Sequence, residues 1–168
     1  DLGQFAVAPG DPDYWATTSF EFGYKCTSNG GLFWEGEGHM NNGLLEDLSK
    51  QSEAAGQNWT FSRTGVGIDY HPFDAHQLVA TYTKQGYIIL SGDGGRTWAY
   101  TGVNTGEASN VFWCRSDTRR IYAGNRRSND GGRSWSNIGN HVVAVSETNP
   151  DLVVGLKGIE RDITAHSL

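Results

Sequence analysis

The sequence predicts an all-β fold made of repeated units of about 37 residues. One octet occurs twice, at residues 91–98 (SGDGGRTW) and 128–135 (SNDGGRSW), with six of its eight positions identical. A weaker copy, TSNGGLFW, occupies residues 27–34. Around these copies, apolar and polar residues alternate between turn signals that recur about every 8–12 residues, which is typical of antiparallel strands. Units of this size indicate a single repeat architecture.

Each octet is preceded by the same succession of strand, polar turn and second strand. The succession begins at Phe5, Ile68 and Val111, and it begins a fourth time at Val142, where no octet follows. We therefore expect one segment over residues 1–168 that contains four units, at about residues 5–34, 65–100, 108–137 and 141–168.

Residues 35–63 interrupt this order as an insertion. Leu44, Leu45 and Leu48 lie at helical spacing and Gly56 is a suitable stop signal, so we expect a short helix within a longer loop. Two roles stay open for its apolar stripe. Either the insertion projects and contacts a neighbouring subunit or a ligand, or the stripe packs on the chain's own unit.

The octet explains itself as a self-capping turn between two strands. The short Asp93 carboxylate can accept hydrogen bonds from backbone N–H groups two or three residues further on. Gly94 and Gly95 permit the positive φ angles of a tight turn, and Trp98 can fold back as an apolar plug. We assign this structural role to the matching positions of all three copies: Thr27, Asn29, Gly31, Trp34, Ser91, Asp93, Gly95, Thr97, Trp98, Ser128, Asp130, Gly132, Ser134 and Trp135.

The pattern Ser-x-Asp-x-Gly-x-Thr-Trp is the Asp box, or BNR repeat, and the sequence resembles Asp-box β-propellers over about residues 5–34 and 65–155. That group includes sialidases, xyloglucanase-type glycoside hydrolases, sortilin-like receptors, photosystem assembly factors and phage virion proteins. The resemblance implies four-stranded blades in which each box joins the third and fourth strands, usually away from the substrate face. Propellers typically use 4–8 blades, and this chain has room for three blades and part of a fourth, so a six- or seven-bladed ring cannot close from it alone. Either the chain is a fragment of a larger protein, or neighbouring chains complete the ring, or the blades form an open array, and we favour the fragment.

Composition excludes several classes of partner. With 13 Lys and Arg against 19 Asp and Glu, the chain has a net charge of −6, which disfavours nucleic acid. No apolar run is long enough to span a membrane. Cys26 and Cys114 cannot form a disulfide framework, and no histidine pair has zinc-ligand spacing, so we expect neither a metal ion nor another cofactor.

Catalytic residues are not singled out by any spacing. A glycosidase needs two carboxylates that face each other across a cleft, and no pair of acids stands out as one. Glu35 and Glu37, which lie beside Trp34 at the mouth of the insertion, form the best acidic cluster. Flat indole rings can stack on sugars, so Trp15, Trp59 and Trp113 are candidate ligand contacts. Glu35 and Glu37 join them as the best acidic cluster.

These observations favour a non-enzymatic structural or interaction segment of a β-propeller. We expect it to be a component of a larger assembly such as a phage tail or another virion structure, located in a virion or outside the cell. Its partners would be other protein chains of the assembly, or a polysaccharide. The alternatives are a fragment of a secreted glycoside hydrolase, xyloglucanase-like or sialidase-like, and a glycan-binding module.

Overall fold

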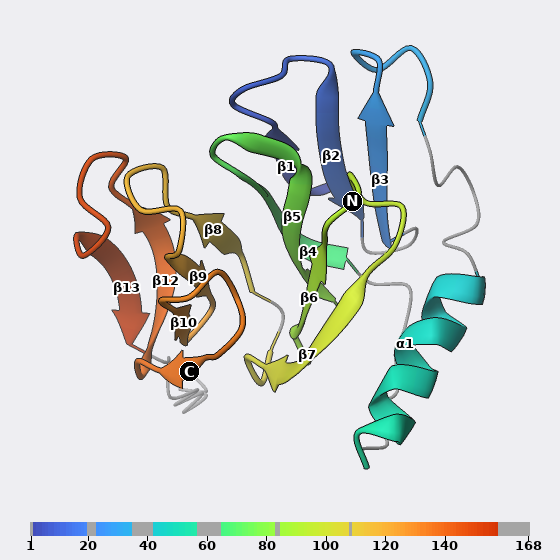
Figure 1. Ribbon diagram of the computed structural model, residues 1–168. Helices are drawn as coiled ribbons and strands as arrows, with labels where there is room; N and C mark the ends of the chain where they lie inside the picture. The colour runs from blue at the N-terminus through green and yellow to red at the C-terminus, as the bar shows by residue number, and fades with distance from the viewer. Residues whose placement is uncertain are drawn as a thin grey trace, which may run out of the picture.

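The computed structural model describes residues 2–19, 23–34, 42–56, 65–82, 85–107 and 109–157, which form four antiparallel sheets and one helix (Figure 1). Sheet I holds β1 (Leu2–Val7), β2 (Tyr14–Ser19) and β3 (Gly23–Ser28). Sheet II holds β4 (Gly65–His71), β5 (Asp74–Tyr82), β6 (Tyr87–Ser91) and β7 (Ala99–Asn104). Sheet III holds β8 (Val111–Trp113), β9 (Ile121–Ala123), β10 (Arg126–Ser128) and β11 (Ser136–Asn137), and sheet IV holds β12 (Asn140–Val145) and β13 (Val153–Lys157).

Within each sheet, every strand pairs with the strands next to it in the sequence, so the connections are simple hairpins. Such hairpins need only short turns, which the Asp, Pro and Gly residues between the strands supply. The predicted all-β fold with four-stranded sheets and one short helix is confirmed. Sheet II runs further than the expected limit at residue 100, because β7 stays paired with β6 as far as Asn104.

The four sheets follow one another face to face, and their first strands β1, β4 and β8 contact in succession (Figure 1). We call the face of a sheet that is turned toward the preceding sheet its leading face, and the opposite face its trailing face. Because side chains alternate across a strand, neighbouring residues serve different faces. On sheet II, Tyr70 is on the leading face and packs in the core shared with sheet I, whereas Val79 is on the trailing face and packs against sheet III.

Hydrogen bonds from two corresponding threonines repeat at successive interfaces. The hydroxyl of Thr18 on sheet I donates to the carbonyl of Val66 at 2.8 Å. At the next interface, the hydroxyl of Thr81 on sheet II donates to the carbonyl of Ser109. Both threonines are fully buried, so the bonds satisfy hydroxyls that would otherwise be costly to bury.

The predicted helix is present as α1 (Asn42–Ala54), and it packs on its own chain. Leu48 is fully buried in the core between sheets I and II. The Gln51 side chain pairs with the backbone at the start of β7, accepting from the Tyr100 N–H at 2.9 Å and donating to the Trp98 carbonyl at 3.2 Å. Of the two roles left open for the apolar stripe, Leu48 takes the second, packing on the chain's own unit. The helix is too short and polar to cross a membrane, and it is the only one in the described part of the chain.

Candidate functional site

The Asp boxes are closed turns whose polar groups are occupied by the turn itself. The Ser91 hydroxyl accepts the backbone N–H groups of Asp93 at 3.3 Å and Gly95 at 2.9 Å. The Asp93 carboxylate accepts the Thr97 N–H at 2.9 Å and the Thr97 hydroxyl at 2.6 Å. The carboxylate thus caps the amide four residues on, and the Arg96 N–H, three residues on as expected, also hydrogen-bonds to it.

The other two boxes repeat this geometry. Asp130 accepts the Ser134 N–H at 2.9 Å and the Ser134 hydroxyl at 2.6 Å. These donors, with the Ser128 hydroxyl, lower the pKa of Asp130 to about 2. In the first box, the Asn29 side-chain oxygen accepts the Phe33 N–H at 2.9 Å. An amide that replaces the carboxylate in the same bond shows that the position supplies a hydrogen-bond acceptor rather than a catalytic base.

The second glycine of each box marks a close contact between sheets. Gly95 has a φ of +92°, and a Cβ added there would lie 2.5 Å from Sγ of Cys26 on sheet I. Gly132 has a φ of +89°, and its Cβ would lie 2.8 Å from Cδ1 of Leu90 on sheet II. At Gly31 of sheet I the corresponding space is filled by the indole of Trp15, which belongs to the same sheet.

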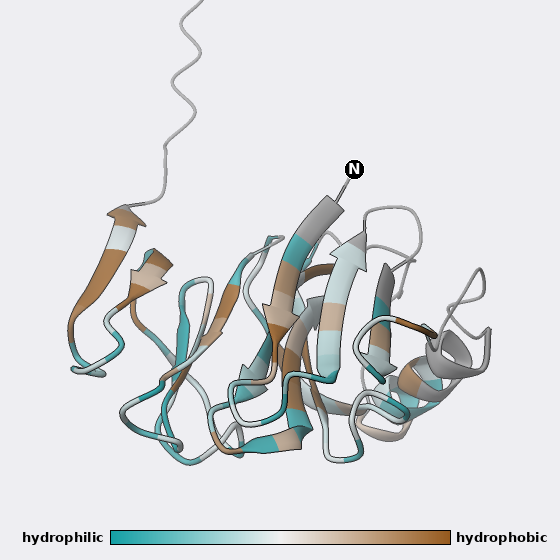
Figure 2. Ribbon diagram, turned by 90° about the horizontal axis from the view of Figure 1, so that it is seen from above, coloured by the Kyte–Doolittle hydropathy of each residue, from teal (hydrophilic) through white to brown (hydrophobic). Residues whose placement is uncertain are grey.

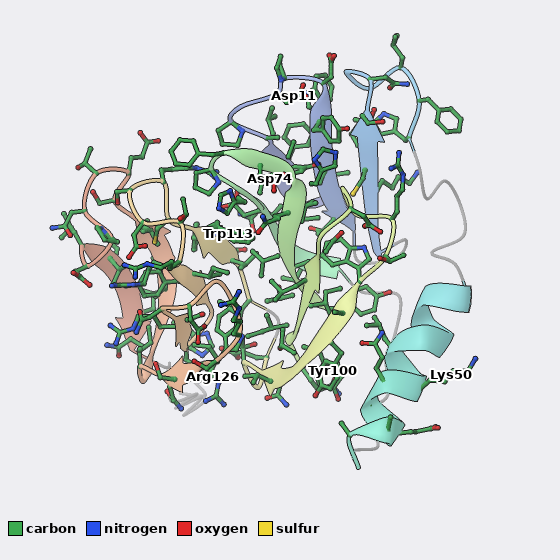
Figure 3. The ribbon with its side chains drawn as sticks, viewed as in Figure 1. Asp11, Lys50, Asp74, Tyr100, Trp113 and Arg126 are labelled. Atoms are coloured by element: carbon green, nitrogen blue, oxygen red, sulfur yellow. The ribbon has the colours of Figure 1, made fainter. Side chains whose placement is uncertain are left out.

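A second capped turn joins the first and second strands of each of the four sheets, and in sheets I to III it lies beside the box. Its acidic or amide side chain accepts the backbone N–H two residues further on at 2.9–3.1 Å, and the residues are Asp11, Asp74, Asp117 and Asn149. The first glycine of each box donates to this turn, as Gly94 does to the His76 carbonyl at 2.9 Å. Figure 3 shows Asp11 and Asp74 at the same end of the molecule and Arg126 at the other end.

A pocket of about 170 Å³ opens where the turns after β8 and β12 approach the first strand of sheet II. Its lining is mixed in charge and consists of Asp69, Phe112, Trp113, Cys114, Arg115, Val145, Ser146 and Glu147. Sequence reasoning missed this pocket, because its residues come from three different units. The only signal in the sequence was the acidic residue Asp69 at a repeat position that is apolar in the other sheets, where it is Ala6, Phe112 or Ala144.

Asp69 is the buried charge in this pocket, and it is fully engaged. Its Oδ1 lies 2.9 Å from Nη2 of Arg115, and its Oδ2 accepts the Trp113 N–H at 2.8 Å. Burial raises the pKa of Asp69, while the Arg115 charge acts in the opposite direction. Burial likewise raises the pKa of the Cys114 thiol to about 11, so this cysteine is a poor nucleophile near neutral pH.

Of the five candidate ligand contacts, the structure describes two, Trp15 and Trp113, which lie on different sheets. Glu35, Glu37 and Trp59 lie outside the described residues. Trp113 is only 4% exposed, and His71 packs edge-on against it with ring centroids 4.9 Å apart. Its rings are therefore covered, and the prediction that Trp113 offers a stacking face to a sugar is wrong.

Trp15 lies elsewhere, in an aromatic row on the leading face of sheet I. Its ring centroid is 6.0 Å from that of Phe5 and 6.3 Å from that of Trp34. Phe5 is 55% exposed, whereas the residues at the same register position of the following sheets, Ile68, Val111 and Val142, are at most 3% exposed. The leading face of sheet I thus presents to solvent a position that is buried in every other sheet.

The trailing face of sheet IV is exposed in the same way. Val154 is 58% exposed, whereas its counterparts Ala16, Val79 and Tyr122 are at most 2% exposed. Leu156 is 54% exposed, and Figure 2 shows β13 as a largely hydrophobic strand at one end of the row of sheets. Sequence reasoning did not single out these two faces. A residue-by-residue alignment of the four units would have identified the residues at these positions.

In the described residues, no three His, Cys, Asp or Glu side chains gather closely enough to hold a metal ion. Asp69 and Glu147 line the 170 Å³ pocket, and Asp69 is bound to Arg115.

The sequence matches no protein-family model and no curated protein. The structure is similar to part of an ancestral GH74 enzyme, with a TM-score of 0.60 and 16% identity over 88% of this chain and 21% of that one. It is similar to the GH74 xyloglucanase of Xanthomonas campestris, with a TM-score of 0.57 and 18% identity over 92% of this chain and 28% of that one. It is also similar to YCF48 in a structure bound to D1 peptide, with a TM-score of 0.51 and 11% identity over 81% of this chain and 38% of that one.

The chain therefore spans well under half of each of these proteins, and the likeness concerns the fold. Together with the three box turns, it identifies the chain as having the fold of a segment of an Asp-box β-propeller.

Proposed function

We propose that this chain is a non-enzymatic structural or interaction segment of a larger assembly, in which its two terminal sheet faces are covered. The observation that carries the proposal is the exposure of Phe5 and Val154, whose counterparts are buried in every other sheet. Exposed apolar surface of this kind marks protein–protein contact sites. A virion structure such as a phage tail, or another extracellular assembly, is the setting that the resemblance to virion propellers suggests.

Two further observations support a binding role. The most conspicuous acids are held in structural bonds, Asp93 and Asp130 in box turns and Asp69 by Arg115. In addition, the same fold occurs in YCF48, of which one structure has a bound peptide. The fold also occurs in GH74 enzymes, so fold alone does not choose between binding and hydrolysis, and a glycoside hydrolase fragment is the alternative to test.

The test is hydroxyl-radical footprinting of the native protein in its assembly, compared with the isolated chain. We expect Phe5 and Leu156 to be protected in the assembly. Phe73 is the matched control, because it is 77% exposed at the turn after β4, away from both terminal faces, and should stay labelled. Equal labelling of the terminal faces in both samples, or turnover of β-glucans or sialosides by the native protein, would overturn the proposal.

A further inference from the structure

We infer that the pocket of about 170 Å³ binds a small zwitterion that carries both a carboxylate and an ammonium group, as a free α-amino acid does. In this site the Arg115 guanidinium binds the carboxylate, and the Glu147 carboxylate binds the ammonium group. The inference goes beyond the proposed function, because the pocket is lined by the first strands of sheets II, III and IV and the turns that follow them. Neither terminal sheet face takes part in it.

The charges of the pocket are departures from the repeat. Two residues before the capping side chain of the first turn, sheet I has Pro9 and sheet II has Pro72. Sheets III and IV have Arg115 and Glu147 at this position, and these two residues bear opposite charges. Asp69 also replaces a residue that is apolar in the other sheets. Since the same capped turn forms with proline, the turn itself does not require either charge.

The Arg115 guanidinium is held in place and keeps donors for a ligand. Its Nη1 donates to the Tyr70 carbonyl at 2.9 Å, and its Nη2 donates to Oδ1 of Asp69 at 2.9 Å. A guanidinium has more N–H groups than these two bonds use. The side chain lines the pocket and is partly exposed. A guanidinium fixed in this way can bind a carboxylate without first losing side-chain freedom.

Glu147 supplies the opposite charge in the same pocket. It is exposed in the turn after β12, and no described residue forms an ion pair with it. Arg115 pairs with Asp69 instead, so the two charges of the turns do not neutralise each other directly. A simple anion would meet the carboxylate of Glu147, and a simple cation would meet the guanidinium of Arg115. A ligand with both charges avoids both repulsions and satisfies both groups.

The size and the apolar lining of the pocket restrict the ligand further. A volume of about 170 Å³ is below the range of about 300–1,000 Å³ that is typical of sites for drug-sized ligands. The pocket therefore suits one small molecule and not a chain of sugars. Phe112 and Val145 add apolar surface beside the charges, which suits a short aliphatic side chain on the ligand.

The experiment titrates the chain with three probes of similar shape: L-alanine, N-acetyl-L-alanine and L-alaninamide. N-acetyl-L-alanine lacks the ammonium group, and L-alaninamide lacks the carboxylate. The backbone amide shifts of the lining residues in NMR spectra report both the affinity and the place of binding. We expect L-alanine to shift these amides and to bind about tenfold more tightly than either analogue, because each analogue loses one charge-assisted contact.

Two variants assign the two charges. Glu147→Gln should weaken the binding of L-alanine about tenfold and should not weaken that of N-acetyl-L-alanine, which has no ammonium group. Arg115→Lys keeps a positive charge but loses the planar fork that pairs with a carboxylate, so it should weaken the binding of both probes. Glu53→Gln is the control, because it makes the same charge change on the exposed side of α1. Figure 3 shows Lys50 of this helix far from Trp113 of the pocket.

Three results would overturn the inference. The first is that millimolar L-alanine leaves the lining amides unshifted in the folded chain. The second is that either analogue binds as tightly as L-alanine. The third is that Glu147→Gln binds L-alanine as well as Glu53→Gln does. None of these results bears on the proposed function, which footprinting of the terminal faces tests separately.

Discussion

The side-chain amide of Gln4 donates a hydrogen bond to the backbone carbonyl of Val111, 107 positions later in the chain, over 3.2 Å. Its oxygen accepts the Ile68 N–H, also at 3.2 Å. One side chain on β1 therefore connects the first strands of sheets I, II and III. These backbone groups lie where neighbouring sheets meet, on edge strands of their own sheets.

Replacing Gln4 by Ala should lower the free energy of unfolding by about 1–2 kcal/mol, because it leaves the Ile68 N–H without its partner. Chemical denaturation measures this. Gln77→Ala is the control, since the Gln77 amide only caps Asp74 in a surface turn, and it should cost less than about 0.5 kcal/mol. Equal losses in the two variants would contradict a bridging role for Gln4.

Substituting Asp130 by Ala should lower the melting temperature, because the Ser134 N–H loses its capping acceptor. Asp130→Asn should lower it less, because Asn29 already shows that an amide oxygen can accept the equivalent N–H. Thermal unfolding of the two variants provides the comparison. The structural assignment fails if Asp130→Ala melts like the wild type but loses binding or activity.

The glycines of the third box should tolerate alanine unequally. Gly131 and Gly132 both have positive φ angles, so alanine costs roughly 1–2 kcal/mol of backbone strain at either position. A Cβ at Gly132 would also press on Leu90, whereas a Cβ at Gly131 meets nothing within 4 Å. Gly132→Ala should therefore be clearly the less stable variant by denaturant midpoint, and equal stability would refute the close contact between sheets II and III.

Arg115→Ala should destabilise the chain by about 2 kcal/mol near pH 7, because it leaves the buried Asp69 charge without its partner. The figure is below the range for fully buried pairs, since the Arg115 side chain is 34% exposed. Arg119→Ala, which removes a surface partner of Asp117, is the control and should change little.

The loss in Arg115→Ala should depend on pH in a defined direction. Burial raises the folded-state pKa of Asp69, and removing Arg115 takes away the charge that opposes this rise. The folded variant then binds more protons than the unfolded chain above the usual Asp pKa, so its stability falls as pH increases through that window. Unfolding free energies measured from about pH 4 to 7 should show the difference between variant and wild type growing with pH. A constant difference would mean that Arg115 does not affect the pKa of Asp69.

Leu48→Ala should cost about 2–5 kcal/mol, because Leu48 is fully buried where α1 meets the core of sheets I and II. Glu53→Ala, on the exposed side of the same helix, should be nearly neutral. The unfolding free energies of the two variants decide whether α1 is part of the folded core. A small loss of unfolding free energy in Leu48→Ala would instead support the alternative that the helix contacts a neighbouring subunit or a ligand.

The repeat made most of the fold predictable. Box and turn chemistry is local, because a short carboxylate, a hydroxyl and two glycines close their turn within eight residues, and the strands follow from alternation. The boxes that contain Asp93 and Asp130 could therefore be assigned to turns from their own residues alone. The helix at Asn42–Ala54 was equally visible from its spacing, although its docking partner was not.

What the sequence determined by itself is thus the repeat, the antiparallel sheets and the turn that closes each box, since all of these depend on residues close together in the chain. The tertiary structure alone decided which faces are covered. It buried Trp113 between two sheets, brought Asp69 to Arg115 across 46 positions and left Phe5 and Val154 exposed at opposite ends of the row. The physical reason is that burial depends on the neighbouring sheet: the same position in the repeat is core when a sheet packs over it and surface when none does.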